Sequence, residues 1–258
     1  MEKKHLFNEI AEQYDKHRAR YSEALFEDIF DYSGVNSNSD VLEIGCGTGI
    51  ATKPFIRKKC RLEAIEIGKN LAEYTIRKYS DYAKFAVRTT SFEDFQSDKE
   101  GYDLIYSATA FHWIPKKIGY KKSYDLLKKE GAIALFWNRP TISDSNMDLK
   151  DEIQLLYKKH LGELDSQRVS QSKEEMYLQV DLELERYGFE DIRTKIYQSS
   201  RALTGEEYVD LLCTYSDHMA LSESLKNPFY NDIRNAIREH DDIIEILDTA
   251  DLHLARKQ

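Results

Sequence analysis

Three glycines at alternate positions, Gly45, Gly47 and Gly49, follow a short apolar run that begins at Val41. The run is typical of a buried strand, and the glycines predict a tight turn that opens a helix. Without a Cβ at these positions, the backbone can bend sharply and approach a ligand more closely than a side chain would permit. The pattern therefore predicts a nucleotide-cofactor turn that holds its ligand largely by main-chain groups.

The spacing of this turn distinguishes between adenosine-containing cofactors. The dinucleotide fingerprint needs its third glycine where this chain has Ile50. Glu43 lies two positions before the first glycine, where it would repel a pyrophosphate and attract a cationic group. S-adenosylmethionine carries an ammonium and a sulfonium and has no phosphate, so it fits these residues better than NAD does.

A second acidic residue, Glu66, closes the next apolar run, which begins at Leu62. A carboxylate at the end of this strand can accept hydrogen bonds from both ribose hydroxyls of an adenosyl group. A glycine turn alone is a weak signal, and a Glu at a strand end is usually a solvated charge. Found in this order, the two motifs predict an adenosyl-binding site.

With these motifs the chain resembles the class I S-adenosylmethionine-dependent methyltransferases over nearly its whole length. The resemblance implies that residues 43–49 bind the cofactor, that Glu66 holds its ribose and that Ile67 packs on its adenine. Ser91 and Phe92 lie where family members often have an Asp that reaches the adenine amino group and a small residue that offers a backbone N–H. Only the backbone contact is expected here, since every residue except proline can supply it.

Residues 102–113 resemble the fourth strand of the family and the loop after it, and Ser107 is expected beside the cofactor. The Phe-His-Trp triplet at 111–113 is similar to the small-molecule branch that includes trans-aconitate methyltransferase and the type 11 methyltransferases. The opening residues match a pattern common in that branch, where this part forms a lid: Phe7, Ala11, Tyr14, Arg18 and Tyr21. The resemblance implies that Arg18 or Tyr14 meets the methionine carboxylate or the methyl acceptor.

The acceptor side of the site has three further candidate residues besides Tyr14. His112 is the candidate general base for a protonated acceptor, and its alternative role is to bond a backbone carbonyl and shape the pocket wall. Trp113 is expected in the acceptor pocket, where packing is its main role. Arg139, at the end of the fifth strand, would grip an anionic acceptor or form a surface ion pair. An acceptor carboxylate would need no general base.

Composition limits the remaining functions. The net charge of −9 over 258 residues argues against a nucleic-acid substrate, which needs a concentrated basic face. Three cysteines without C-x-x-C spacing and seven scattered histidines predict neither a disulfide framework nor a metal site. Neither a signal-peptide core nor an apolar run long enough to cross a membrane is present, which predicts a cytoplasmic protein. The oligomeric state is not predicted.

The remaining pattern predicts a single α/β domain with a Rossmann-like, seven-stranded and mostly parallel sheet, helices on both faces and an antiparallel last strand. Ser22 is expected to cap a helix that Gly34 ends, and Thr204 to open another with a capping box. A further helix is expected over 231–239. Residues 1–33 are expected to form an N-terminal lid or helices. A polar loop is expected over 141–146, within a helical insertion or cap over 141–186. Strands are expected at 41–44, 62–66, 84–88, 104–107, 131–137, 191–198 and 250–255.

Two rival functions stay open at this point. An NAD-linked oxidoreductase is disfavoured because the third fingerprint glycine and a recognisable hydride-transfer dyad are missing. A noncatalytic protein that kept the fold and the cofactor is the other alternative, since folds host more than one function.

Overall fold

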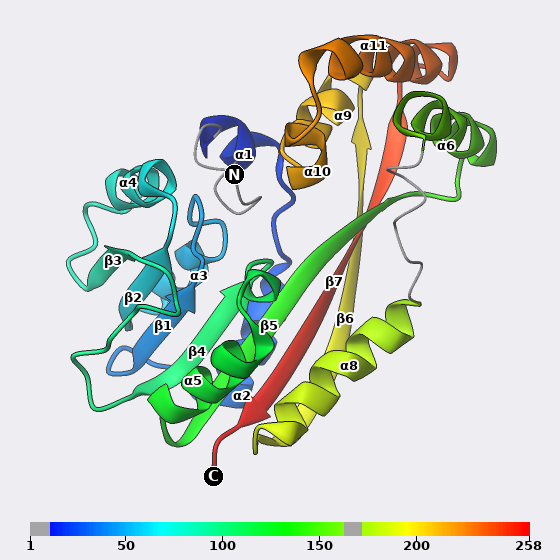
Figure 1. The fold of residues 1–258 in the computed structure, drawn as a ribbon. Coiled ribbons are helices and arrows are strands. Elements are labelled where there is room, and N and C mark those ends of the chain that lie inside the picture. The colour runs from blue at the N-terminus through cyan, green and yellow to red at the C-terminus, as the bar shows by residue number, and fades with distance from the viewer. Residues whose placement is uncertain (1–10, 163–171) are drawn as a thin grey trace. The chain divides into compact units, whose positions relative to one another are not determined.

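The computed structural model of the protein describes residues 11–162 and 172–258, which are coloured in Figure 1. The chain divides into two compact units. Unit 1 comprises residues 1–19, 139–172 and 198–249, and unit 2 comprises residues 20–138, 173–197 and 250–258. The expected organisation as a single domain stays a prediction, and Phe7, expected in the lid pattern, lies outside the described residues.

Seven strands form one sheet in the order β3-β2-β1-β4-β5-β7-β6. They are β1 (Asp40–Ile44), β2 (Arg61–Glu66), β3 (Phe85–Thr89), β4 (Tyr102–Ala108), β5 (Leu127–Ile142), β6 (Glu190–Leu203) and β7 (Ile244–Arg256). The first five pair in parallel, and the last strands are antiparallel. The strand order reverses at β1, which lies between β2 and β4, so the loops after β1 and β4 flank the position where open α/β sheets bind ligands. This confirms the predicted fold class.

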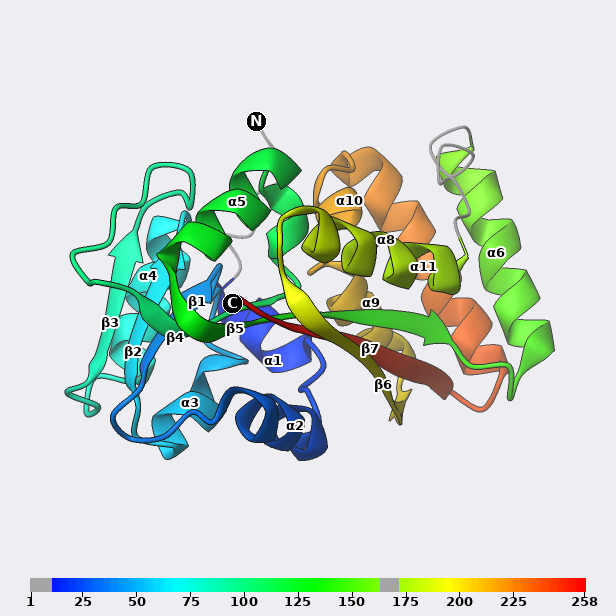
Figure 2. The ribbon, with the colours of Figure 1, turned by 90° about the horizontal axis from the view of Figure 1, so that it is seen from below.

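In unit 2, helices cover both faces of the parallel strands (Figure 2). Side chains alternate between the faces, so Leu104 and Tyr106 belong to one buried cluster and Ile105 to the other. The first face is covered by α2 (Glu23–Ser33) and α3 (Thr52–Arg57), and the second by α5 (Lys116–Leu126) and α8 (Lys173–Arg186). The helix α4 (Lys69–Lys78) lies against β2 and β3.

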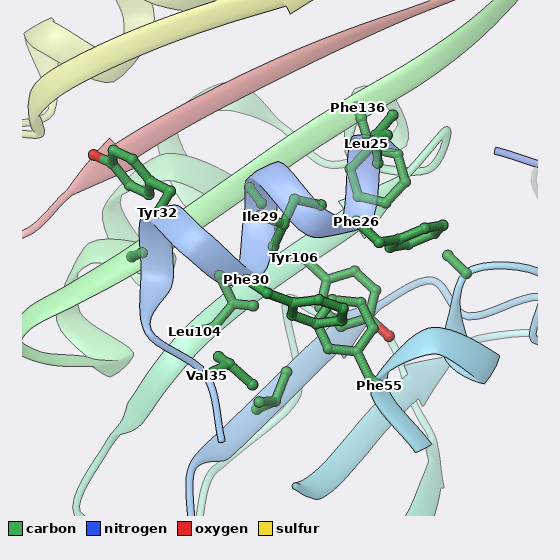
Figure 3. Close-up of a cluster of buried hydrophobic side chains, with 14 of the residues drawn as sticks. Leu25, Phe26, Ile29, Phe30, Tyr32, Val35, Phe55, Leu104, Tyr106 and Phe136 are labelled. Atoms are coloured by element: carbon green, nitrogen blue, oxygen red, sulfur yellow. The ribbon is translucent and has the colours of Figure 1, made fainter. Parts of the chain in front are cut away.

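Figure 3 shows the first of these clusters. The ring of Phe55 stacks on that of Tyr106 with 4.0 Å between centroids, and the edges of Phe26 and Phe30 meet Phe55. The helix α2 begins after Ser22, whose hydroxyl accepts from Leu25 N–H, and ends at Gly34 in the left-handed conformation, as predicted. Its apolar side is buried in the cluster, so residues 23–33 cover the sheet. The lid role of the residues before them stays a prediction.

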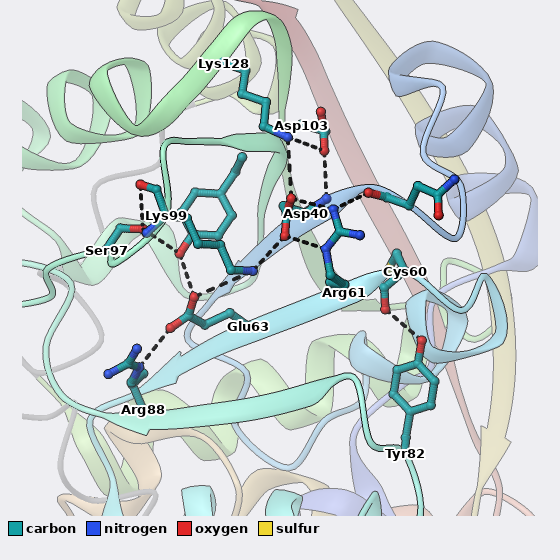
Figure 4. A network of polar contacts seen from close by, with 12 residues as sticks. Asp40, Cys60, Arg61, Glu63, Tyr82, Arg88, Ser97, Lys99, Asp103 and Lys128 are labelled. Carbon is teal, nitrogen blue, oxygen red and sulfur yellow. Dashed lines mark hydrogen bonds and ion pairs between the residues drawn. The ribbon is translucent and has the colours of Figure 1, made fainter.

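An ion-pair network fixes the amino ends of β1 and β2 (Figure 4). Asp40 accepts hydrogen bonds from Arg61 Nε at 2.9 Å and Lys99 Nζ at 3.0 Å, and the bonds from Arg61 hold the Asp40 pKa well below its usual range. Glu63 accepts from Arg88 Nε at 2.9 Å and from the hydroxyl of Tyr102 at 2.7 Å. The contact between Asp40 and Arg61 joins β1 to β2 at the end of β1 opposite the glycine turn.

Unit 1 has its own buried cluster, built on α6 (Met147–Leu161), α9 (Gly205–Leu212) and α11 (Glu223–Glu239). The expected capping box is confirmed, since Thr204 and Glu207 bond each other's backbone N–H. The shorter elements of this unit are α1 (Ala11–His17) and α10 (Ser216–Met219).

Two boundaries in unit 1 were predicted wrongly. The expected polar loop from Thr141 begins too early, because β5 continues to Ile142 and Ser143 N–H still bonds the carbonyl of Glu245. The helix expected over 231–239 begins at Glu223 and tolerates Pro228, because its apolar side is buried in the cluster. None of the helices in the described ranges is long and apolar enough to cross a membrane.

Candidate cofactor and methyl-transfer site

The turn after β1 combines two packed glycines with an open one. Gly45 has φ of +71°, and a Cβ there would lie 2.5 Å from the Cβ of Ala110. Gly49 is closed off by Tyr79 in the same way. Gly47 also has a positive φ, +55°, but a Cβ there would meet no atom within 4 Å. The protein packs against the outer glycines and leaves open space at the middle one, as a main-chain cradle for a ligand requires.

Glu66 ties the end of β2 to this turn. Its Oε2 accepts from Gly47 N–H at 2.9 Å and its Oε1 from Gly68 N–H at 2.8 Å. Burial raises the pKa of Glu66, against the effect of the Gly68 and Gly47 N–H groups. Since each carboxylate oxygen can accept more than one hydrogen bond, the group can bind ribose hydroxyls without releasing the turn.

Glu43 is a second buried carboxylate close to the turn. Its side chain is 1% exposed, and its Oε2 accepts from the hydroxyl of Thr52 at 2.6 Å. Burial raises the pKa of Glu43 to about 7, and the charge of Glu66 adds to the rise. The region therefore concentrates potential negative charge that a sulfonium or an ammonium would compensate.

Three of the predicted cofactor residues already use their side chains within the protein. The hydroxyl of Ser107 donates to the carbonyl of Ile44 at 2.9 Å and joins β4 to β1. Phe92 is buried in the second core cluster. The hydroxyl of Ser91 donates to Asp94 at 2.7 Å and accepts from Asp94 N–H at 3.0 Å, which closes a local turn. Any contact with a ligand from Ser107 or Phe92 would therefore come from the main chain, while Ile67 follows Glu66 and is half-buried.

The loop after β4 begins with a strained residue that the sequence did not reveal. Thr109 has φ of +52°, which is rare for a β-branched residue. Three contacts impose this conformation: Thr109 N–H bonds the Phe136 carbonyl at 2.8 Å, and its hydroxyl contacts Tyr21 Oη at 2.6 Å and Asn138 N–H at 3.2 Å. Such strain collects at functional sites. Here it turns the chain so that Ala110 lies over Gly45.

His112 and Trp113 follow within a short 3-10 helix, Phe111–Trp113. His112 is exposed, whereas Trp113 is half-buried with its ring centroid 4.8 Å from that of His112. The indole N–H of Trp137, at the end of the buried part of β5, donates to His112 Nδ1 at 3.1 Å. His112 therefore lies two residues beyond the contact between Ala110 and the glycine turn, and its role toward the acceptor stays a prediction.

A family model described as a methyltransferase domain matches residues 41–131, which contain the turn, Glu66 and His112. The match and the site geometry support a class I S-adenosylmethionine-dependent methyltransferase. The methyltransferase is 24% identical to methyltransferase C25B8.09 of Schizosaccharomyces pombe, over 87% of this chain and 84% of that protein. It is 27% identical to malonyl-[acyl-carrier protein] O-methyltransferase of Acetivibrio thermocellus, over 50% of this chain and 46% of that one.

Solved structures share the fold of the methyltransferase at low sequence identity. Phosphoethanolamine N-methyltransferase 2 of Haemonchus contortus, in complex with S-adenosylhomocysteine, is 11% identical with a TM-score of 0.56, over 99% of this chain and 57% of that one. Cyclopropane synthase MmaA2 of Mycobacterium tuberculosis is 14% identical with a TM-score of 0.56, over 98% and 97% of the two chains. At these identities the likeness concerns the fold alone.

Three predicted residues of the methyltransferase, Tyr14, Arg18 and Arg139, lie in unit 1. Arg18 donates from Nη2 to the Thr214 carbonyl at 2.7 Å, and its guanidinium lies 4.4 Å from the ring centroid of Tyr215 and 4.9 Å from that of Tyr14. Arg139 is half-buried at the start of the segment that unit 1 takes from β5. The roles of Tyr14, Arg18 and Arg139 toward the cofactor or the acceptor stay predictions.

Metal ligands were not expected in the methyltransferase. Within residues 11–162 and 172–258, no three His, Cys, Asp or Glu side chains are grouped so that they could hold a metal ion. Cys46, Cys60 and Cys213 are free thiols.

Proposed function

We propose that the methyltransferase transfers the methyl group of S-adenosylmethionine to a small-molecule acceptor, as members of the trans-aconitate methyltransferase-like, type 11 branch do. The observation that carries the proposal is the bond between Glu66 and Gly47, which joins the ribose-binding acid to the open position of the glycine turn. Two buried carboxylates at a main-chain cradle suit a cationic donor that has no phosphate.

The predicted cofactor residues of unit 2 each have a part in this proposal. Glu66 holds the ribose, Ile67 packs on the adenine, and the main chain at Ser91, Phe92 and Ser107 supplies further contacts. Glu43 provides negative charge for the ammonium or the sulfonium through the turn it supports. When bound, S-adenosylmethionine supplies a methyl group attached to a sulfonium, and this sulfur is already an activated leaving group. Positioning and exclusion of water therefore supply most of the acceleration.

The acceptor is proposed to be an oxygen nucleophile of a small molecule or acyl group. The relative from Acetivibrio thermocellus is named as an O-methyltransferase of malonyl-[acyl-carrier protein], and a malonyl group offers a carboxylate oxygen. Arg139 would pair with such an anion. Contacts with the acceptor are also proposed for Tyr14 and Trp113, and contacts with the methionine carboxylate or the acceptor for Arg18. The proposed compartment is the cytoplasm.

Calorimetric titration with S-adenosylmethionine and, separately, with NAD tests the cofactor half of the proposal. Binding of the first and not of the second is expected, and the reverse would favour an oxidoreductase. Transfer of a radiolabelled methyl group to trans-aconitate, to a malonyl thioester and to a metabolite extract tests the acceptor half. Donor binding without label in any small molecule, RNA or protein would point to a noncatalytic cofactor-binding protein.

A further inference from the structure

The contact between Trp137 and His112 fixes which imidazole nitrogen carries a proton. An indole N–H can only donate a hydrogen bond. The 3.1 Å bond from Trp137 Nε1 therefore requires an unprotonated Nδ1 on His112. A neutral imidazole with an unprotonated Nδ1 carries its proton on Nε2.

A histidine in this tautomer is a hydrogen-bond donor at Nε2. Nε2 already carries a proton and has no lone pair to accept another. Nδ1 can accept a proton only after the bond to Trp137 is broken. A general base for the acceptor needs the opposite arrangement, in which a third group accepts from Nδ1–H and leaves Nε2 unprotonated. The arrangement around His112 thus has the wrong polarity for a base.

Trp137 is itself held in place from three elements of unit 2. Its ring meets His253 of β7 edge to face, with 6.0 Å between centroids and 73° between planes. The imidazole of His253 is fully buried between Asp181 Oδ1 of α8 at 2.6 Å and Asp251 Oδ2 at 3.3 Å. Thr194 of β6 bonds the Asp181 carboxylate at 2.8 Å. A side chain packed on such a network has little freedom to turn its N–H away from His112.

We infer that Trp137 is a positioning residue that keeps His112 in the Nε2–H tautomer, so that His112 donates a hydrogen bond to the methyl acceptor and does not deprotonate it. The inference rests on the proposed function, in which the loop after β4 meets the acceptor. It implies an acceptor that arrives as an anion. The C–S bond then breaks with its electron pair left on sulfur, an acceptor lone pair forms the new bond to the methyl carbon, and no proton is transferred.

The tautomer is tested directly by long-range proton–nitrogen NMR on ¹⁵N-labelled protein, with the His112 signals identified by their loss in His112→Gln. Wild type is expected to show His112 protonated at Nε2 and not at Nδ1. Trp137→Phe is expected to lose this preference and show a mixture of tautomers, whereas Trp113→Phe, the matched change at the only other tryptophan of the sequence, keeps it. A wild-type protein with His112 protonated at Nδ1 would overturn the inference.

Methyl transfer supplies the second test. The side-chain NH₂ of Gln can replace Nε2–H as a donor, but an amide cannot serve as a base. We expect His112→Gln to keep activity within a few-fold of wild type, and His112→Phe to lose about 10- to 100-fold in kcat/KM, the worth of a hydrogen bond to a charged group. Equal loss in both variants would refute the donor role. A confirmed tautomer in a protein that methylates no acceptor would instead refute the proposed function.

Discussion

The carboxylate of Glu66 accepts a hydrogen bond from the backbone N–H of Gly47 at 2.9 Å, which joins two motifs that are 19 residues apart. The acid at the end of β2 is therefore a part of the turn after β1 and not a neighbouring, independent charge. One oxygen holds the middle glycine and the other holds Gly68, so the group that would bind the ribose also shapes the loop beneath it.

Substitution of Glu66 by Gln tests this double role. The amide keeps the size of the side chain, but its NH₂ must face one of the two backbone N–H groups that the carboxylate now accepts from. We expect the free energy of S-adenosylmethionine binding to weaken by about 1 to 3 kcal/mol, measured by calorimetry. Glu73→Gln, an exposed position on α4, is the matched control and should leave affinity unchanged. Unchanged affinity in Glu66→Gln would remove Glu66 from the site.

The two glycines at the start of the turn are expected to differ in their tolerance of alanine. Gly47→Ala should lose about 1 to 2 kcal/mol of unfolding free energy in urea denaturation, because alanine is unfavourable in a left-handed conformation and nothing else opposes it there. Gly45→Ala adds a clash with the Ala110 Cβ, for a further loss of about 1 to 3 kcal/mol.

The double variant Gly45→Ala with Ala110→Gly separates these causes. Removal of the Ala110 Cβ should restore the steric part of the loss and leave the backbone part, so the double variant should resemble Gly47→Ala. If Ala110→Gly gives no recovery, close approach of the two loops is not what requires a glycine at position 45.

The sequence was sufficient to predict the glycine turn, the position of Glu66 at the end of a strand and the strands of the sheet, because each of these depends on local rules. A glycine spacing determines a turn, and an apolar run between turn residues determines a buried strand. Ser22, Gly34 and Thr204 were predicted correctly as caps for the same reason, since a cap acts within a few residues of its helix.

The contacts that organise the loop after β4 could not be predicted, because they join residues distant in sequence. Thr109 owes its conformation to Tyr21 and Asn138, 88 and 29 residues away. The pairing of Trp137 with His112 spans 25 residues and carries no local pattern. Ser107 is expected beside the cofactor, and the direction of its hydroxyl toward Ile44 could not be predicted because it depends on the register between β4 and β1.

The pH dependence of donor binding should report on Glu43. Its pKa of about 7 means that the carboxyl gains a proton as the pH falls through neutrality, and its attraction for a cationic donor is then lost. We expect the affinity for S-adenosylmethionine to fall about tenfold between roughly pH 8.5 and 5.5, the equivalent of about 1.4 kcal/mol. Glu43→Gln should bind weakly at both pH values with a flatter profile. A profile in Glu43→Gln as steep as that of wild type would assign the titration to another group.

His253 should make the stability of the methyltransferase depend on pH in the opposite sense to Asp40, whose pKa is lowered in the folded state. Burial alone would lower the pKa of His253, but the hydrogen bonds to Asp181 and Asp251 outweigh it and raise the pKa. Both nitrogens lie within bonding distance of a carboxylate, an arrangement that favours the imidazolium form. A group with a raised pKa in the folded state stabilises fully below its unfolded value of about 6.5, and that stabilisation is lost as the pH rises through the folded pKa.

We therefore expect the free energy of unfolding in urea to decrease as the pH rises above about 6.5, with a slope that is absent from His253→Gln. The variant also leaves two buried or half-buried carboxylates without their cation, which should cost about 3 to 5 kcal/mol below that pH. His240→Gln, at a partly exposed pair with Glu152, is the control and should cost less than about 1 kcal/mol. Equal pH slopes in wild type and His253→Gln would show that His253 is neutral in the folded protein, because only a titrating imidazolium can supply the difference.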